Sequence, residues 1–200
     1  MATSEPKASI WTPANIVTCI RMVFVPAWLL VAELAWPSPR GTEFCMPLLL
    51  SCIFYVVLSL TDKLDGYLAR SRGEVTTFGK FLDPIADKLI VVMGLCYLLE
   101  HGVVSSWVLL IVVLREFAVS GLRMVVSSKG VVVAASNLGK AKTATTMIAI
   151  CGLLLVVSFA AGRMTSMLKL CFNVILWVAM ALTLYSGYDY LVKCWKYVTE

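Results

Sequence analysis

Long apolar stretches follow one another along most of this chain, and short polar segments separate them. A helix needs about 20 mostly apolar residues to span a bilayer. The stretches have roughly that length, and they lack the alternation of apolar and polar positions that is typical of strands. The pattern therefore predicts an all-α integral membrane protein with six transmembrane helices. The expected spans are Asn15–Ala35, Phe44–Leu60, Leu82–Leu99, Ser106–Val126, Ala141–Ala161 and Leu168–Val192.

The composition agrees with this reading. The chain has 200 residues, of which 60% are hydrophobic and 14% charged, and its mean hydropathy is +0.88. These values are too apolar for an ordinary soluble domain. Because six helices occupy nearly the whole chain, we expect one membrane domain over residues 14–196. An interfacial segment at residues 1–13 would precede it, and a short tail at residues 197–200 would follow it.

The positive charges indicate an orientation in the membrane. With six spans both termini lie on one side, and 13 of the 17 lysines and arginines then fall on that side. Three fall on the other side, and Arg115 falls within a helix. Cytoplasmic loops carry an excess of basic residues, so we expect a multi-pass protein of the cell (inner, cytoplasmic) membrane with both termini in the cytoplasm. The net charge of +5 is explained by this sidedness, without nucleic acid as a partner.

Four aspartates stand between the second and third apolar stretches. Asp62 and Asp65 are three residues apart, and Asp83 and Asp87 are four apart, so each pair shares one face of a helix. Pro84 is expected at the start of a helix, with Asp83 as its N-cap. The sequence therefore predicts that two helices meet at the cytoplasmic membrane surface, each carrying two carboxylates.

Four neighbouring carboxylates repel one another unless a cation lies among them. Oxygen ligands at helical spacing suit Mg²⁺ or Mn²⁺, and two such ions would balance four charges. A paired-metal site can catalyse displacement at phosphorus. One alternative is that the carboxylates solvate helix ends or pair with nearby basic residues, which explains one aspartate better than four. A divalent-cation transporter is a further alternative, although acids of that class often lie near the membrane midplane.

The aspartates belong to a longer pattern. Asp62-x-x-Asp65-Gly66-x-x-Ala69-Arg70 is followed, after eight residues, by Gly79-x-x-x-Asp83-x-x-x-Asp87. This pattern resembles the complete signature of the CDP-alcohol phosphotransferases. The resemblance implies that family's six-helix fold, usually as a homodimer, with two divalent ions and a CDP-linked lipid donor. It implies metal ligation by Asp62, Asp65, Asp83 and Asp87, general-base catalysis by Asp87, and CDP-lipid binding by Asp62, Gly66, Ala69, Arg70 and Gly79.

Basic residues gather in the second half of the chain, where Glu116 is the only acid between positions 106 and 142. Arg115 and Arg123 are eight residues apart, ~12 Å along a helix and within the same half of its surface. An ionisable residue inside a predicted span is a functional candidate. A phosphate-bearing acceptor alcohol would need such a pocket, whereas serine, choline or ethanolamine would not. The basic residues are Arg115, Arg123, Lys129, Lys140 and Lys142.

The segment SNLGKAKT at residues 136–143 predicts a capped helix start, where backbone N–H groups and lysines favour an anion. Lys140 and Lys142 are two residues apart and should face different ways, and we favour Lys140 as the anion ligand. Positive-inside anchoring at lipid headgroups is the alternative for these basic residues, and it is strongest for Lys129.

The segments REFAVSGLR and NLGKAKT are similar to those of one branch of the family, the phosphatidylglycerophosphate synthases, as is the opening TPANIVTCIRMVFVP. The resemblance implies transfer of a phosphatidyl group from CDP-diacylglycerol to sn-glycerol 3-phosphate, which yields phosphatidylglycerophosphate and CMP in phospholipid biosynthesis. Arg115, Arg123 and Lys140 would bind the acceptor's phosphate. A phosphatidylinositol-phosphate synthase would also need a basic pocket, but REFAVSGLR fits that activity less well. The implied partners are both substrates, membrane lipids and a second copy of the chain.

Overall fold

The computed structural model describes residues 12–36, 44–72, 77–128 and 137–199, and these residues form six α-helices without any strand. The prediction of an all-helical chain with six helices is confirmed. The expected interfacial segment lies almost wholly outside the described residues. The helices are α1 (Pro13–Ala35), α2 (Met46–Arg72), α3 (Thr77–Glu100), α4 (Ser106–Ser128), α5 (Asn137–Val157) and α6 (Arg163–Thr199).

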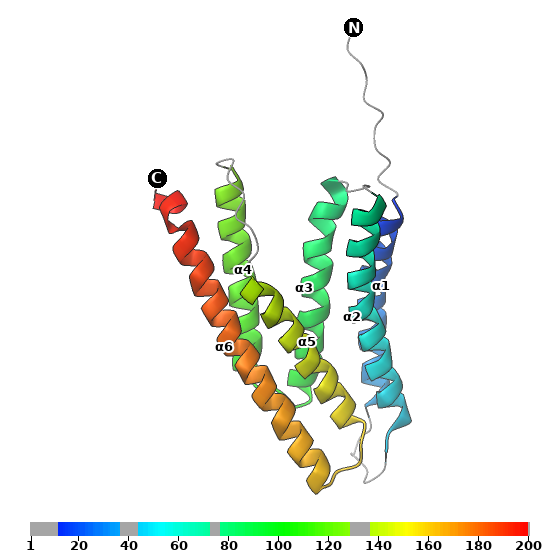
Figure 1. The fold of residues 1–200 in the computed structure, drawn as a ribbon. Helices are drawn as coiled ribbons and strands as arrows, with labels where there is room; N and C mark the ends of the chain where they lie inside the picture. Colours follow the sequence, from blue (N-terminus) through cyan, green and yellow to red (C-terminus); the bar gives the residue numbers. More distant parts are fainter. Residues whose placement is uncertain (1–11, 37–43, 73–76, 129–136, 200) are drawn as a thin grey trace.

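Successive helices run in opposite directions, so α1 begins and α6 ends at the same end of the bundle, which is the upper end in Figure 1. Helices α1, α2 and α3 contact one another, and α6 contacts α4 and α5. Helix α5 also contacts α2 and α3, and thereby joins the two groups. The ends of α2 and α4 and the starts of α3 and α5 therefore all point toward the upper end.

The polar helix ends extend further than the apolar pattern predicted. Helix α2 continues from the apolar stretch that ends at Leu60 as far as Arg72, and α3 begins at Thr77. Pro84 lies inside α3, so the prediction that Asp83 caps the start of this helix was wrong. A proline inside a helix removes one backbone hydrogen bond, but Pro84 is exposed and the helix continues through it.

Membrane spanning is clearest for two helices. In the described part of the chain, Asn15–Ala35 and Arg163–Trp195 are long and apolar enough to cross a membrane, while Met46–Thr61 and Ala141–Val157 are shorter apolar helices. Six helices are thus confirmed, whereas six membrane crossings stay a prediction.

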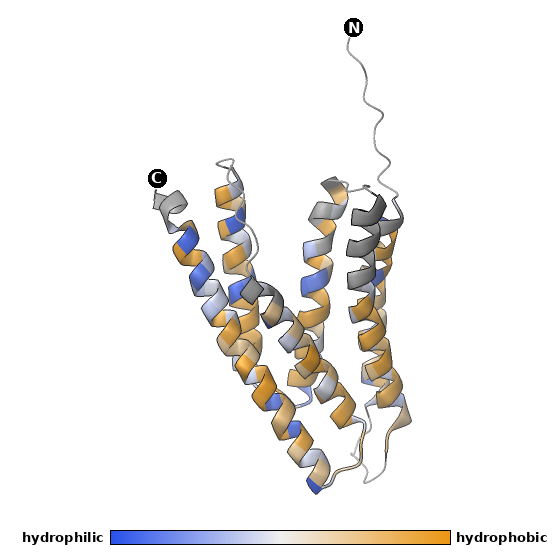
Figure 2. Cartoon of the chain, viewed as in Figure 1, coloured by the Kyte–Doolittle hydropathy of each residue, from blue (hydrophilic) through white to orange (hydrophobic). Residues whose placement is uncertain are grey.

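Apolar side chains cover much of the outer surface. Figure 2 shows apolar residues along most of each helix, with hydrophilic residues more frequent in the upper halves of α3 and α4. Leu34 on α1 is 78% exposed, and Phe117 on α4 is 76% exposed. Soluble monomers rarely expose large apolar patches. This surface, together with the two long apolar helices, indicates a membrane protein.

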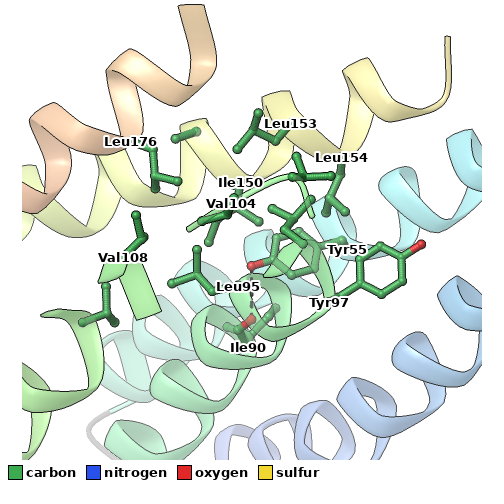
Figure 3. Close-up of a cluster of buried hydrophobic side chains, with 14 of the residues drawn as sticks. Tyr55, Ile90, Leu95, Tyr97, Val104, Val108, Ile150, Leu153, Leu154 and Leu176 are labelled. Atoms are coloured by element: carbon green, nitrogen blue, oxygen red, sulfur yellow. Dashed lines mark hydrogen bonds between the residues drawn. The ribbon is translucent and has the colours of Figure 1, made fainter. Parts of the chain in front are cut away.

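Three buried aromatic side chains tie α1, α2 and α3 together in pairs. The Trp28 indole on α1 donates to the carbonyl of Ser51 on α2 (3.0 Å), and the Tyr55 hydroxyl on α2 donates to that of Ile90 on α3 (3.1 Å). The Tyr97 hydroxyl on α3 donates back to a carbonyl of α1 (3.1 Å). Figure 3 shows Tyr55, Ile90 and Tyr97 within the apolar core. Because buried polar groups need partners, these bonds favour one register of the three helices.

Candidate active site

The four aspartates occupy the upper ends of two helices that contact each other. Asp62 and Asp65 lie in α2, and Asp83 and Asp87 lie in α3, so the prediction of two carboxylates on each of two helices is confirmed at the level of the backbone. Gly66, Ala69 and Arg70 follow on α2, and the buried Gly79 precedes Asp83 on α3. The described side chains include that of Asp87 but not those of Asp62, Asp65, Ala69, Arg70 and Asp83.

Asp87 is held by a cation from the first helix. Nη1 of Arg21 on α1 donates to Oδ1 of Asp87 at 3.1 Å. The Arg21 side chain is only 1% exposed, whereas that of Asp87 is 48% exposed. A guanidinium buried on an apolar helix needs acceptors, and Asp87 supplies one while keeping part of its surface open.

A second group of charges lies around Glu116 on α4. Nη1 of Arg115 donates to Oε1 of Glu116 at 3.0 Å, and Nζ of Lys142 on α5 donates to the same oxygen. Nζ of Lys88 on α3 lies 3.9 Å from Oε2 and donates to the hydroxyl of Ser120. We call Lys88, Arg115, Glu116 and Lys142 the Glu116 cluster.

The Glu116 cluster joins four helices. Beside the contacts from α3, α4 and α5, Nη2 of Arg115 donates to the hydroxyl of Ser186 on α6 at 3.2 Å. The aliphatic part of the Arg115 side chain passes close to Gly187. A Cβ added at Gly187 would lie 3.2 Å from Cγ of Arg115. Three cations and one carboxylate carry a formal charge of +2, since 3 − 1 = 2. Because Lys142 and Arg115 are largely buried, this charge is poorly screened and favours an anion.

The start of α5 brings Lys142 to this cluster. Helix α5 begins at Asn137, close to the predicted start, although Ser136, the first residue of the predicted capped segment, lies outside the described residues. Figure 1 shows that α5 begins part-way along α4 instead of level with its upper end. The Lys142 side chain, in the second turn of α5, thereby reaches Glu116 in the middle of α4.

The other predicted anion ligands differ in what the structure describes. Arg123 lies two turns beyond Arg115 on α4, is exposed, and makes no hydrogen bond or ion pair within the described part of the chain. The side chain of Lys140 lies outside the described residues. Asp87 and Lys88 are consecutive on α3, so one turn of this helix connects the aspartates to the Glu116 cluster.

Comparison with known proteins identifies the family. The model for CDP-alcohol phosphatidyltransferase matches residues 11–185. The chain belongs to this family. It is similar to the CDP-diacylglycerol–glycerol-3-phosphate 3-phosphatidyltransferase of Bacillus subtilis (strain 168), with 37% identity over 91% of this chain and 94% of that protein. The protein of the same name in Rickettsia felis is 40% identical over 92% of this chain and 95% of its own length.

A third relative carries a related name. The probable phosphatidylglycerophosphate synthase of Mycobacterium tuberculosis (strain ATCC 25618 / H37Rv) is 33% identical over 94% of this chain and 83% of its own length. The matches cover both the aspartate helices and the Glu116 cluster, since the family model extends from residue 11 to residue 185. An enzyme family is thus shown, which disfavours the divalent-cation transporter.

CDP-alcohol phosphatidyltransferases generally depend on divalent metal ions, and the donor set of this chain suits them. Four aspartates on adjacent helix ends offer the oxygen ligands that Mg²⁺ and Mn²⁺ prefer. Within the described part of the chain no group of three or more possible metal ligands comes together, and three of the four aspartate side chains lie outside that part. The fit therefore rests on ligand chemistry and on the position of the backbone.

Several residues of this candidate site were not among the predicted site residues. Arg21 was counted as a sidedness charge and as part of the similar opening segment TPANIVTCIRMVFVP, but it was given no role in a site. Asn15, Thr18 and Arg21 recur every third residue of α1, and all three are buried. Such a polar face on an apolar helix is a signal for an internal site. Lys142 was set aside in favour of Lys140, because the helical phase alone cannot say which lysine faces α4. Lys88 was not chosen, and Glu116 was noted only as an ionisable partner of Arg115 within a predicted span.

Proposed function

We propose that this chain transfers a phosphatidyl group from CDP-diacylglycerol to sn-glycerol 3-phosphate, which forms phosphatidylglycerophosphate and releases CMP. The observation that carries this proposal is the similarity to relatives named for that reaction over more than nine-tenths of the chain. Those names also favour glycerol 3-phosphate over inositol phosphate as the acceptor. The Glu116 cluster supports a phosphorylated acceptor, since its formal charge of +2 complements a phosphate of about −1.5 to −2.

The donor would bind where α2 and α3 meet. Asp62, Asp65, Asp83 and Asp87 would hold two divalent ions, Mg²⁺ or Mn²⁺. Such ions supply stabilisation of the negative charge on the transferred phosphate and on the departing CMP. The small residues Gly66, Ala69 and Gly79 would leave room for the cytidine, with Asp62 at its edge and Arg70 beside the diphosphate. The lipid tails would stay among the exposed apolar side chains and the surrounding bilayer.

Asp87 would act as the catalytic base. The acceptor hydroxyl gives its proton to the Asp87 carboxylate while its oxygen forms a bond to the phosphorus on the lipid side. The bond from that phosphorus to the CMP oxygen breaks, and CMP leaves with the bonding electrons. The contact between Arg21 and Oδ1 of Asp87 supports this role, because it fixes the direction of the carboxylate while half of the side chain stays accessible.

The acceptor's phosphate would bind on the α4 side. Arg115, Arg123 and Lys140 stay the proposed ligands, and the positions of Lys88 and Lys142 in the Glu116 cluster add these two lysines to the basic region. Since Lys88 directly follows Asp87, an acceptor whose phosphate lies at the cluster could present its hydroxyl toward Asp87. This arrangement supports direct transfer between two bound substrates.

The membrane arrangement completes the proposal. All six helices would cross the inner membrane, with residues 14–196 as one membrane domain, residues 1–13 at the cytoplasmic interface and residues 197–200 as a tail. The upper end in Figure 1, where α1 begins, α6 ends and the candidate active site lies, would face the cytoplasm. Both termini would lie on that side. The chain would act as a homodimer.

Product analysis tests the proposed function. Purified protein in detergent micelles with CDP-diacylglycerol, Mg²⁺ and glycerol 3-phosphate should yield a lipid with the mass of phosphatidylglycerophosphate. The same mixture with serine in place of glycerol 3-phosphate is the control and should yield no new phospholipid. A product that incorporates serine, or no product with glycerol 3-phosphate, would overturn the assignment of the acceptor.

A further inference from the structure

Glu116 presents a physical puzzle at a site for an anionic substrate. It is the only acidic residue between positions 106 and 142, yet its carboxylate lies among three cations. By Coulomb's law alone, a carboxylate beside the binding site weakens the attraction for a phosphate. If Glu116 contributes to acceptor binding, its contribution must therefore outweigh this electrostatic repulsion.

The geometry shows what Glu116 does to its neighbours. One oxygen, Oε1, accepts hydrogen bonds from Arg115 of α4 and Lys142 of α5, and the other, Oε2, faces Lys88 of α3 at 3.9 Å. One side chain thus hydrogen-bonds cations of two helices and forms a longer ion pair with a cation of a third. Arg115 and Lys142 lie where the acceptor's phosphate is proposed to bind, and Lys88 directly follows Asp87 in the chain.

Without Glu116, Arg115 would keep its bond to Ser186 and Lys88 its bond to Ser120, but the substrate would have to order Lys142. A lysine side chain has a flexible four-carbon stem, and fixing it on binding opposes association through lost conformational entropy. A carboxylate that already holds the nitrogens removes part of this loss before the phosphate arrives. It also fixes the distance between the basic region and α3, on which transfer to a second bound substrate depends.

We propose that Glu116 is a positioning residue, which holds Arg115, Lys142 and Lys88 in place for the phosphate of the acceptor and aligns that phosphate with the aspartates of α3. The inference rests on the proposed function and extends it to a residue that touches neither substrate. Glu116 then strengthens acceptor binding, whereas its negative charge alone would weaken it.

The direction of the change in KM separates repulsion of the phosphate by the carboxylate from positioning of the cations by it. In Glu116→Gln the negative charge is lost, so electrostatics alone predicts tighter binding and a lower KM for glycerol 3-phosphate. Positioning predicts the reverse, an increase in this KM of about tenfold, while the KM for CDP-diacylglycerol stays within about twofold of wild type. Glu116→Asp keeps the charge but shortens the side chain, so electrostatics predicts no change and positioning again predicts a higher KM.

The experiment measures steady-state CMP release with each substrate varied in turn, on detergent-purified protein whose thermal unfolding has been recorded. Asp189→Asn is the matched control, because Asp189 also pairs with a lysine, Lys193 at 2.7 Å, but on the exposed end of α6. This control should leave both KM values unchanged. If Glu116→Gln does not fold, the KM of Glu116→Asp for glycerol 3-phosphate alone distinguishes positioning from electrostatics.

A double-variant cycle identifies the route of the effect. If Glu116 acts through Lys142, then Glu116→Gln combined with Lys142→Met should raise the KM for glycerol 3-phosphate by less than the product of the two single effects. A lower or unchanged KM in both Glu116 variants, or equal changes for both substrates, overturns the positioning role. Wild-type protein that releases no CMP with glycerol 3-phosphate overturns the proposed function instead, so the two failures are distinguishable.

Discussion

The contact between Gly94 and Tyr55 gives a prediction that the structure makes quantitative. A Cβ added at Gly94 on α3 would lie 2.6 Å from Oη of Tyr55, 2.9 Å from its Cε2 and 3.0 Å from its Cζ. An ordinary contact begins at 3.4 Å, so the hydroxyl would have to move by 0.8 Å, since 3.4 − 2.6 = 0.8. The ring of Tyr55 is fully buried and packs against Trp28 at 4.9 Å between centroids, which leaves it little room.

Three terms set the size of the effect of Gly94→Ala. Overpacking a core costs ~1–3 kcal/mol. Loss of the hydrogen bond from Tyr55 to the Ile90 carbonyl costs a further ~1 kcal/mol. Alanine gains ~1 kcal/mol over glycine in a helix interior. The sum is a decrease of about 1–3 kcal/mol in the free energy of unfolding, with weaker CMP release because Tyr55 ties α2 to α3 near both aspartate pairs.

Denaturant unfolding in detergent micelles measures this free energy, and Tyr55→Phe supplies the test of the mechanism. The phenylalanine lacks the atom nearest to the new methyl group, so Gly94→Ala should cost less in the Tyr55→Phe background than in wild type. Gly121→Ala is the control, because nothing lies within 4 Å of its added Cβ. Wild-type stability of Gly94→Ala, or effects of the two substitutions that add within ~0.5 kcal/mol, would refute the reasoning.

Three further predictions concern the site. Arg21→Met should lower kcat for CMP release by about 10- to 100-fold, because Asp87 loses the cation that orients it; an unchanged kcat in folded protein would contradict this. Arg123→Ala should raise the KM for glycerol 3-phosphate more than the KM for CDP-diacylglycerol, and the opposite split would remove Arg123 from the acceptor site. Chelation with EDTA should abolish CMP release, and added Mg²⁺ or Mn²⁺ should restore it; release that persists at saturating EDTA would argue against the metal site.

Local spacing made part of this architecture predictable. The aspartates of α2 and of α3 could be placed on two helices because intervals of three and four residues depend only on the helical repeat. The apolar stretches end at Leu60 and begin again at Leu82, but they mark expected membrane spans and not helix ends, since backbone hydrogen bonds within a helix continue past the last apolar residue. Pro84 was misread for a related reason, because a helix start is the commoner but not the only position for proline.

The contacts that the sequence did not predict depend on how helices are placed against one another. That Lys142 reaches Glu116 follows from the position of α5 relative to α4, which no interval in the sequence encodes. The contact between Arg21 and Asp87 likewise joins residues 66 positions apart. The buried polar face of α1 was visible in the sequence, but its partner became identifiable only when α1 lay against α3.

Acceptor-dependent release of CMP tests the central claim most directly. Purified protein with CDP-diacylglycerol and Mg²⁺ should release CMP when glycerol 3-phosphate is added, and should release none with inositol phosphate, with serine or without an acceptor. Asp87→Asn should abolish the release while leaving the protein folded. Release of CMP with inositol phosphate or serine instead of glycerol 3-phosphate would contradict the account.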